Sequence, residues 1–166
     1  MREYFKPSDK MLSEIEYGSV IYIKHKNTRG QDVRHYAIVC NLNPKEDAEI
    51  VLAVITSDDK SAALVPRIKK MFGESTVVHV PEVAFKKLCH LSFINCNLPV
   101  FRNLNQLCEE VDSGEASFYY PGISQPIRVE LSIQGMLNSK SVTIEQKAYI
   151  REKCLLQQLN LEQSPL

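Results

Sequence analysis

Four polar residues in this sequence combine the groups that transfer protons and bind an anion. They supply one guanidinium, one imidazole and two hydroxyls, from Arg34, His35, Thr56 and Ser57. An imidazole gives or takes a proton near neutral pH, and a guanidinium stabilises negative charge on a phosphate. Cleavage of RNA through its own 2′-hydroxyl needs a proton acceptor, a proton donor and a cation. We therefore take these residues as the candidate catalytic group, with Ser57 expected to orient its neighbours.

Two apolar runs must position these side chains. Both are rich in β-branched residues, and a turn with asparagine, proline and aspartate separates Tyr36–Cys40 from Ile50–Ile55. This pattern predicts two paired, buried strands. Because antiparallel pairing brings the start of one strand beside the end of the next, Arg34, His35 and Thr56 are expected at one rim of a sheet. In the alternative interpretation, the hydroxyls only cap a strand and Arg34 is a solvated flank.

A basic loop leads into the first of these runs. Residues 24–35 carry four lysines and arginines against one aspartate, together with two histidines. These charges favour a phosphate-binding loop, whose candidate RNA-binding residues are Lys24, His25, Lys26 and Arg29. A solvated hairpin tip is the other interpretation of such a charge run.

The composition limits the class of protein. The chain has 166 residues, a formal net charge of +0 and an apolar fraction of 44%. This length predicts a single domain over 1–166, since domains of about 100–150 residues are the commonest. The balance of charged and apolar residues predicts a folded globule and argues against a disordered chain or a strongly basic DNA-coating protein. Contact with nucleic acid would need a local patch.

Predictions of cofactors and compartment follow from the cysteines and the N-terminus. The five cysteines lack the paired short spacing of a zinc site and no glycine-rich phosphate loop is present, so we expect no metal and no cofactor. An odd number of cysteines, with no apolar segment after Met1, favours reduced thiols in a cytoplasmic protein. No run approaches the ~18 apolar residues of a transmembrane helix, so no membrane contact is expected.

The remaining pattern predicts strands first and helices later. Helices are expected over 7–17, 82–91, 104–111 and 143–159. Further strands are expected over 20–23, 76–80 and 92–96, with an irregular segment over 58–73 and a surface excursion over 118–122. The periodicity of 127–137 fits a helix and a strand equally well. This order indicates an α+β fold, mainly β: a small, curled antiparallel sheet or barrel with helices packed at one side.

The order of these features resembles the MazF/PemK-type toxins of toxin–antitoxin pairs. In that family a first strand that begins at glycine leads to a basic loop, a second strand begins at an Arg-Pro-Ala-Val-Val-like sequence, and a third ends in Ile-Thr-Ser. The matching segments, within residues 17–111, are Tyr17–Ile21, Arg34–Val39, Val54–Ser57 and Leu91–Asn97. With Ala37 aligned to the family's alanine, His35 and Tyr36 stand where arginine and proline are usual. Asn97-Leu98-Pro99 replaces the family's Asp-Gln stretch.

This resemblance implies an SH3-like barrel core over 17–111 with helical insertions, and C-terminal helices over 127–160 packed on it. It also implies a homodimer that cuts single-stranded RNA without a metal and is held inactive by an antitoxin protein. The family's catalytic arginine and threonine correspond to Arg34, or to His35 if the register shifts by one, and to Thr56. A non-catalytic SH3-like module that binds a protein partner or RNA through the same rim is the alternative.

Overall fold

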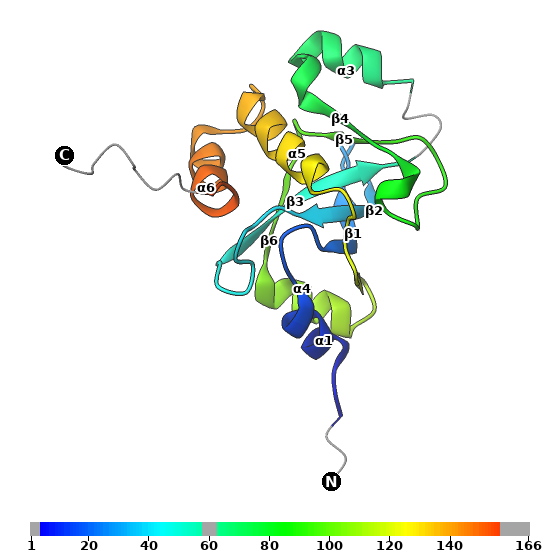
Figure 1. The fold of residues 1–166 in the computed structure, drawn as a ribbon, viewed down its shortest axis with the longest axis vertical. Coiled ribbons are helices and arrows are strands. Elements are labelled where there is room, and N and C mark those ends of the chain that lie inside the picture. Colours follow the sequence, from blue (N-terminus) through cyan, green and yellow to red (C-terminus); the bar gives the residue numbers. More distant parts are fainter. Residues whose placement is uncertain (1–3, 58–62, 157–166) are drawn as a thin grey trace, which may run out of the picture.

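Three long strands form the centre of a sheet (Figure 1). They are β1 (Val20–Lys26), β2 (Asp32–Val39) and β3 (Glu49–Thr56), and consecutive strands pair antiparallel. The pairing sets Tyr36 opposite Ile55, so the predicted pairing of the two apolar runs is confirmed. The structure, a computed structural model, describes residues 4–57 and 63–156.

The other edge of β3 pairs with two different strands. Its first four residues pair with β6 (Val100–Asn103), and its last two pair with β5 (Ser92–Asn95). At the two ends of the sheet, β4 (Val77–Val80) pairs with β5, and β7 (Ser117–Tyr119) pairs with β1. The strand order is β4-β5-β3-β2-β1-β7, with β6 on β3. Every pairing in the sheet is antiparallel. Within residues 4–57 and 63–156 no pairing joins β7 to β4 or β6, so hydrogen bonds do not close the sheet.

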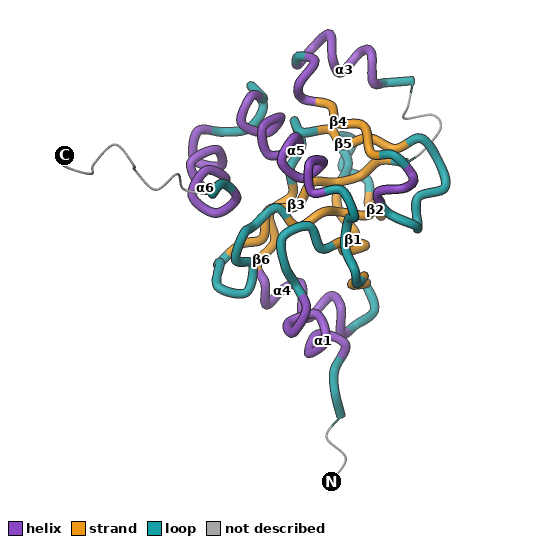
Figure 2. The backbone as a smooth tube through the Cα atoms, viewed as in Figure 1, coloured by secondary structure: helices purple, strands orange, loops and turns teal. Residues whose placement is uncertain are grey.

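Helices cover both faces of the sheet. α5 (Pro126–Asn138) and α6 (Ile144–Cys154) lie on one side, and α1 (Pro7–Glu14) and α4 (Leu104–Asp112) lie together on the other (Figures 1 and 2). The α+β class is therefore confirmed, and so is the packing of the C-terminal helices on the sheet. The expectation that all helices pack at one side is wrong, because α1 and α4 cover the opposite face.

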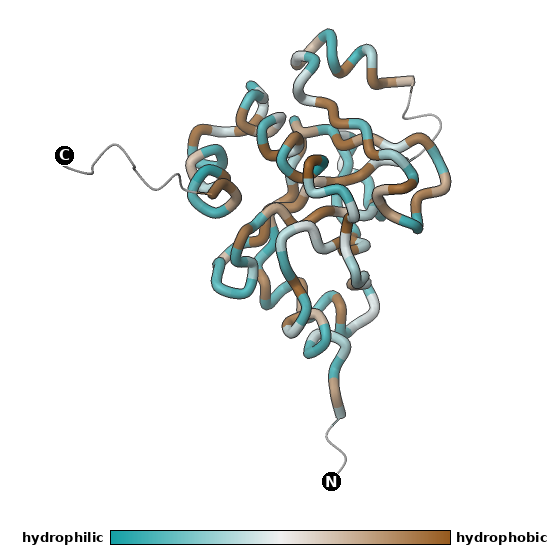
Figure 3. The backbone as a smooth tube through the Cα atoms, in the orientation of Figure 1, coloured by the Kyte–Doolittle hydropathy of each residue, from teal (hydrophilic) through white to brown (hydrophobic). Residues whose placement is uncertain are grey.

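The two faces follow from the alternation of side chains along each strand. Apolar residues occur at both odd and even positions of β2 and β3, so both faces are buried and each has its own core. The first core includes Ile38, Val51, Ile55, Ile133 and Ile150. The second core includes Met11, Ile21, Val39, Leu52 and Leu107. In Figure 3 the hydrophobic colour follows β3, whereas hydrophilic residues predominate along α6.

Capping residues fix two of the predicted helices. The Asn103 side chain accepts a hydrogen bond from the backbone N–H of Asn105 (2.8 Å) and starts α4. Thr143 and Gln146 form the predicted capping box, with two reciprocal hydrogen bonds of 3.1 Å, at the start of α6. The open question over 127–137 is answered by helix α5.

Other predicted elements are corrected. The helix expected over 82–91 is only a single 3-10 turn, Glu82–Ala84. The segment expected to be irregular contains α3 (Val65–Phe72), although residues 58–62 lie outside the described residues. The excursion at 118–122 begins within strand β7, and β6 was not predicted at all. Both strands have only three or four residues and show no alternation of apolar and polar residues. They are extended because β7 pairs with β1 and β6 pairs with β3.

Candidate catalytic site

Arg34 and His35 lie on opposite faces of β2, because neighbouring residues of a strand alternate. Tyr36 packs against the core under α5 and α6, whereas Ala37 belongs to the core under α1 and α4. Arg34 therefore shares the face of Tyr36, and His35 shares the face of Ala37. Only one of the two can lie on the same face as Thr56.

The register of β2 and β3 decides which one it is. Continued by one residue beyond the last pair, it places Thr56 level with His35 and on the same face. Ser57 follows the end of β3, and one further step of the same register would set it level with Arg34, on the other face. Thr56 and Ser57 are half-buried, as is His35, whereas Arg34 is exposed. The structure thus divides the four predicted residues into two pairs rather than gathering them in one pocket.

A second histidine supports His35. The Nε2 atom of His25 lies 2.8 Å from Nδ1 of His35, and the two ring centroids are 5.1 Å apart. The other ring nitrogen of His25, Nδ1, lies 3.1 Å from the backbone carbonyl oxygen of Lys26. A carbonyl only accepts, so Nδ1 of His25 donates and its Nε2 accepts in the neutral ring. Nδ1 of His35 must then carry the proton, which leaves the lone pair of a neutral His35 on Nε2.

The pKa of His25 favours this arrangement. Burial of the ring lowers its pKa below the ordinary value, and the nearby positive charge of Arg102 lowers it further. The hydrogen bond to the carbonyl of Lys26 acts in the opposite direction, but the net shift is downward. The neutral form of His25 is therefore favoured, and this is the form that accepts a hydrogen bond from His35.

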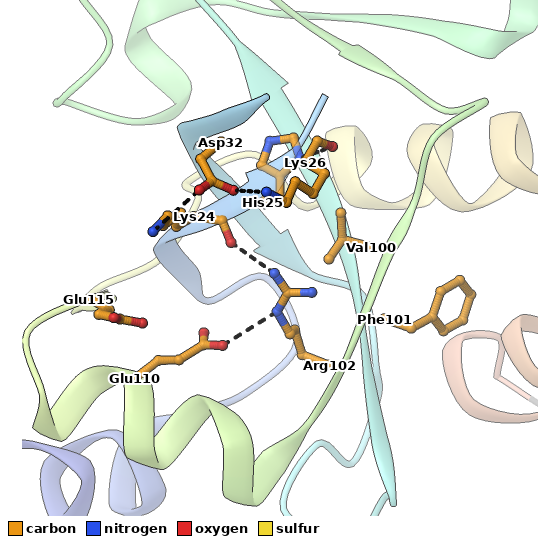
Figure 4. A pocket seen from close by; sticks show the side chains of 9 residues that line it. All are labelled: Lys24, His25, Lys26, Asp32, Val100, Phe101, Arg102, Glu110 and Glu115. Atoms are coloured by element: carbon orange, nitrogen blue, oxygen red, sulfur yellow. Dashed lines mark hydrogen bonds and ion pairs between the residues drawn. The ribbon is translucent and has the colours of Figure 1, made fainter. Parts of the chain in front are cut away.

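A cavity of about 470 Å³ opens beside His25 (Figure 4). It lies between the end of the β1–β2 hairpin, strand β6 and helix α4. Its lining residues are Lys24, His25, Lys26, Asp32, Val100, Phe101, Arg102, Glu110 and Glu115. At its centre Arg102 donates from Nη2 to the backbone carbonyl of Lys24 (2.8 Å), and its Nε lies 3.7 Å from a carboxylate oxygen of Glu110. Arg102 thereby links β6, β1 and α4 around the cavity.

Carboxylates compensate the cations of this cavity. The carboxylate of Asp32 forms ion pairs with the ammonium groups of Lys26 (2.7 Å) and Lys24 (3.6 Å). The hydrogen bond from Lys26 is the main reason that the pKa of Asp32 lies below its ordinary value. With Glu110 and Glu115, the lining holds as many carboxylates as lysine and arginine cations. The cavity is therefore close to neutral, and the predicted basic loop is less positive than its sequence indicates.

The predicted RNA-binding residues have different surroundings. Lys24 and Lys26 are exposed but ion-paired with Asp32, and His25 is half-buried against His35. Arg29 is exposed at the turn of the hairpin, with its backbone N–H bonded to the side chain of Asn27 (2.9 Å). Three of the four thus line the cavity, and Arg29 does not.

Sequence reasoning missed Arg102 and Glu110. Arg102 belongs to β6, which lies 78 residues from its hydrogen-bond partner Lys24 in the chain. No local spacing could have indicated this contact. The pairing of His25 with His35 had a signal, since the two lie at similar distances from the turn of one hairpin.

Other classes of site were also compared with the structure. No cluster of three or more histidine, cysteine, aspartate or glutamate side chains suited to a metal ion occurs in residues 4–57 and 63–156. In the same part of the chain, no helix has the length and apolar character needed to cross a membrane. A scan against models of known protein families finds no match for this chain, and a search of curated proteins finds none either.

Proposed function

We propose that this protein is a metal-independent endoribonuclease of the MazF/PemK type, which cleaves single-stranded RNA at the rim formed by β2 and β3. The observation that carries the proposal is the hydrogen bond of 2.8 Å between His35 and His25, on the face that His35 shares with Thr56. This bond places the lone pair of a neutral His35 on Nε2. A ring held in that tautomer is suited to take a proton from a substrate hydroxyl.

The reaction follows from this placement. Nε2 of His35 takes the proton of the 2′-hydroxyl, and the 2′-oxygen forms a bond to the adjacent phosphorus. The bond from phosphorus to the 5′-oxygen breaks, and that oxygen takes a proton from water. The products are a 2′,3′-cyclic phosphate and a 5′-hydroxyl. The hydroxyl of Thr56 donates a hydrogen bond to a non-bridging oxygen, where negative charge grows in the transition state.

The resemblance supports the same assignment. With Ala37 aligned to the family's alanine, His35 stands where the family has its catalytic arginine, and Thr56 stands where it has its threonine. An SH3-like barrel, a homodimer, an antitoxin partner and a cytoplasmic location are parts of this proposal. The strand order supports the barrel, because β3 pairs with β2 on one edge and with both β5 and β6 on the other, as a strongly curled sheet allows.

RNA cleavage by the purified protein tests the proposal. Single-stranded RNA is incubated with the protein in EDTA, and cyclic-phosphate ends are detected by mass spectrometry. His35→Ala is expected to lower the rate about 10²- to 10⁴-fold, the usual contribution of a general base. His79→Ala serves as the control, since His79 is an exposed histidine on β4. Intact RNA at a large excess of protein, or equal rates for wild type and His35→Ala, would overturn the proposal.

A non-catalytic module that binds a protein partner is the second candidate. The balanced charge of the cavity beside His25 favours it, since compensated cations attract phosphate weakly and a mixed-charge protein surface well. The same RNA experiment separates the two functions, because a module of this kind leaves the RNA intact.

A further inference from the structure

Two tyrosines and two cations, of which Lys24 is ion-paired with Asp32, form a block on the face of the sheet opposite His35. In the β1–β2 pairing Tyr22 lies opposite Tyr36, and the next pair on the same face is Lys24 opposite Arg34. Directly opposite residues of an antiparallel pair point to the same face, and so do residues two apart in a strand. The rings of Tyr22 and Tyr36 lie 4.9 Å apart between centroids. Aromatic and cationic side chains therefore alternate along this end of the hairpin.

Two neighbouring segments extend the block. The ring of Tyr119 on β7 lies 5.6 Å from that of Tyr36, and the ammonium of Lys87 lies 5.9 Å from the centroid of Tyr119. Phe85, which is buried, packs edge-on beneath Tyr36 at 5.2 Å. We call Tyr22, Tyr36, Tyr119, Arg34 and Lys87 the tyrosine surface.

The tyrosine surface is accessible, and the pKa of one of its phenols, that of Tyr36, is raised. Tyr22, Tyr36 and Tyr119 are half-buried, whereas Arg34 is exposed. Burial and the neighbouring Tyr119 raise the pKa of Tyr36, so its phenol stays uncharged at neutral pH. Phe85 packs edge-on against Tyr36 and Tyr119, and the rings of Tyr22 and Tyr36 are inclined by 47° to one another, so a ligand meets tilted rings backed by a buried side chain.

We propose that the tyrosine surface binds the bases of single-stranded RNA by stacking, while Arg34 and Lys87 contact the flanking phosphates. Aromatic rings that alternate with cations are the arrangement by which proteins hold single strands without reading their sequence. The proposal rests on the proposed function, because its ligand is the RNA that His35 cleaves. Arg34 and His35 are consecutive residues at the rim, so an RNA strand that crosses the rim touches both faces of β2. The two pairs of polar residues would then act on successive nucleotides.

Binding is measured with a non-cleavable probe, which separates this proposal from catalysis. The probe is a fluorescein-labelled 2′-O-methyl oligoribonucleotide of mixed sequence, which has no free 2′-hydroxyl, and the readout is fluorescence anisotropy. Tyr22→Leu is expected to raise Kd about 5- to 150-fold, from the loss of one stacked base. Tyr22→Phe keeps the ring and is expected to bind like the wild type. Circular dichroism of both variants shows whether the fold is kept.

Arg34→Gln tests the phosphate contact. It is expected to weaken binding and to reduce the slope of log K against log salt by about 0.7, the value for one lost contact to a single strand. Arg151→Gln is the matched control, since Arg151 is exposed on α6, and that helix lies apart from β1 and β2 in Figure 1. The control is expected to leave both Kd and the slope unchanged.

The outcomes distinguish this proposal from the proposed nuclease. Equal binding by wild type and a folded Tyr22→Leu overturns the tyrosine surface, and so does the absence of any binding to the probe. If unmodified RNA is still cut in either case, the nuclease stands. If Tyr22→Leu loses binding while the wild type leaves unmodified RNA intact, the tyrosine surface stands and the nuclease does not. The labelled probe bound to the wild type can also be competed with other ligands. If a proline-rich peptide displaces the probe and unlabelled single-stranded RNA does not, the surface binds protein, and the RNA assignment is overturned.

Discussion

The imidazoles of His25 and His35 share a hydrogen bond of 2.8 Å near the turn of the β1–β2 hairpin. Because Nδ1 of His25 donates to the Lys26 carbonyl, the direction of this bond is determined, and His35 donates it. One ring therefore sets the tautomer of the other. In the proposed reaction, the tautomer of the candidate base His35 is therefore set by the neighbouring His25.

Replacement of His25 is expected to free the tautomer of His35. In His25→Phe the Nδ1–H of His35 loses its acceptor, so His35 populates both neutral tautomers. The rate of RNA cleavage is expected to fall about 3- to 10-fold, which corresponds to the net free energy of one hydrogen bond. Nitrogen-15 NMR of the imidazoles measures the tautomer directly, whether or not RNA is cut. His25→Gln keeps an acceptor oxygen and serves as the comparison. An unchanged tautomer in His25→Phe would contradict this role of His25.

The lowered pKa of His25 predicts how stability changes with pH. In the unfolded chain His25 titrates near its ordinary value of 6.5, and in the folded chain it titrates lower. Between these two values the unfolded chain binds more protons, so the free energy of unfolding rises with pH there. Stability is therefore highest above pH 6.5, falls as the pH drops below it, and becomes level below the folded pKa.

Urea unfolding at a series of pH values measures this effect. The slope of the unfolding free energy against pH is expected to be smaller in His25→Gln than in the wild type across the acidic window. Parallel curves for the two proteins would show that His25 titrates alike in the folded and unfolded chains.

Asn41 is predicted to be the most sensitive polar residue of the β2–β3 connection. Its side chain is fully buried, accepts a hydrogen bond from the backbone N–H of Val51 (2.7 Å) and donates to the carbonyl of Glu49 (2.9 Å) and to Asp47 (2.8 Å). Asn41→Leu leaves the buried N–H of Val51 unpaired, whereas the Glu49 carbonyl keeps the hydroxyl of Tyr149 and Asp47 keeps the ammonium of Lys153. The substitution is expected to destabilise the protein by ~1–3 kcal/mol.

Denaturant unfolding checks this value. Asn105→Ala, at an exposed position of α4, is the control and is expected to change stability by less than ~0.5 kcal/mol. A loss below ~1 kcal/mol for Asn41→Leu would mean that the buried N–H of Val51 finds another acceptor.

The cysteines are predicted to differ sharply in reactivity. Cys89 is exposed, whereas Cys40, Cys96 and Cys154 are buried. Burial raises the pKa of Cys96 and of Cys154 to about 12, and it also raises the pKa of Cys40 and Cys108. Since the thiolate is the reactive form, Ellman's reagent at pH 8 is expected to modify one thiol quickly in the native protein. Cys89→Ser should remove this fast phase, and a fast phase that survives the substitution would contradict the assignment.

The sequence predicts the centre of the fold and not its margins. The strands that hold Tyr36 and Ile55 are readable because β-branched residues fill both of their faces. The start of α6 is readable because Thr143 and Gln146 cap it through local hydrogen bonds. β6 and β7 are too short to show a period. In α3, the cations and Pro66 in its first turn obscure the helical pattern.

The candidate site was predictable in part for the same reason. Antiparallel pairing brings the start of β2 and the end of β3 to one rim of the sheet. The same pairing sets Thr56 opposite His35. The cavity was not predictable, because Arg102 reaches Lys24 from a distant part of the chain. The separation of Arg34 from His35 was available from the sequence, since two consecutive residues of a strand cannot share a face.

Because Arg34 and His35 lie on opposite faces of β2, the register of β2 determines which of the two side chains lies beside Thr56. A single residue inserted in the turn between β1 and β2, and one removed from the turn between β2 and β3, would slip β2 by one residue against both neighbours. The slip would exchange the two side chains between faces and set a guanidinium beside Thr56. Hairpins that differ by one residue in this way would place an imidazole or a guanidinium at the same position in space. The lengths of the two turns would then determine whether Arg34 or His35 lies beside Thr56, without a substitution of either residue.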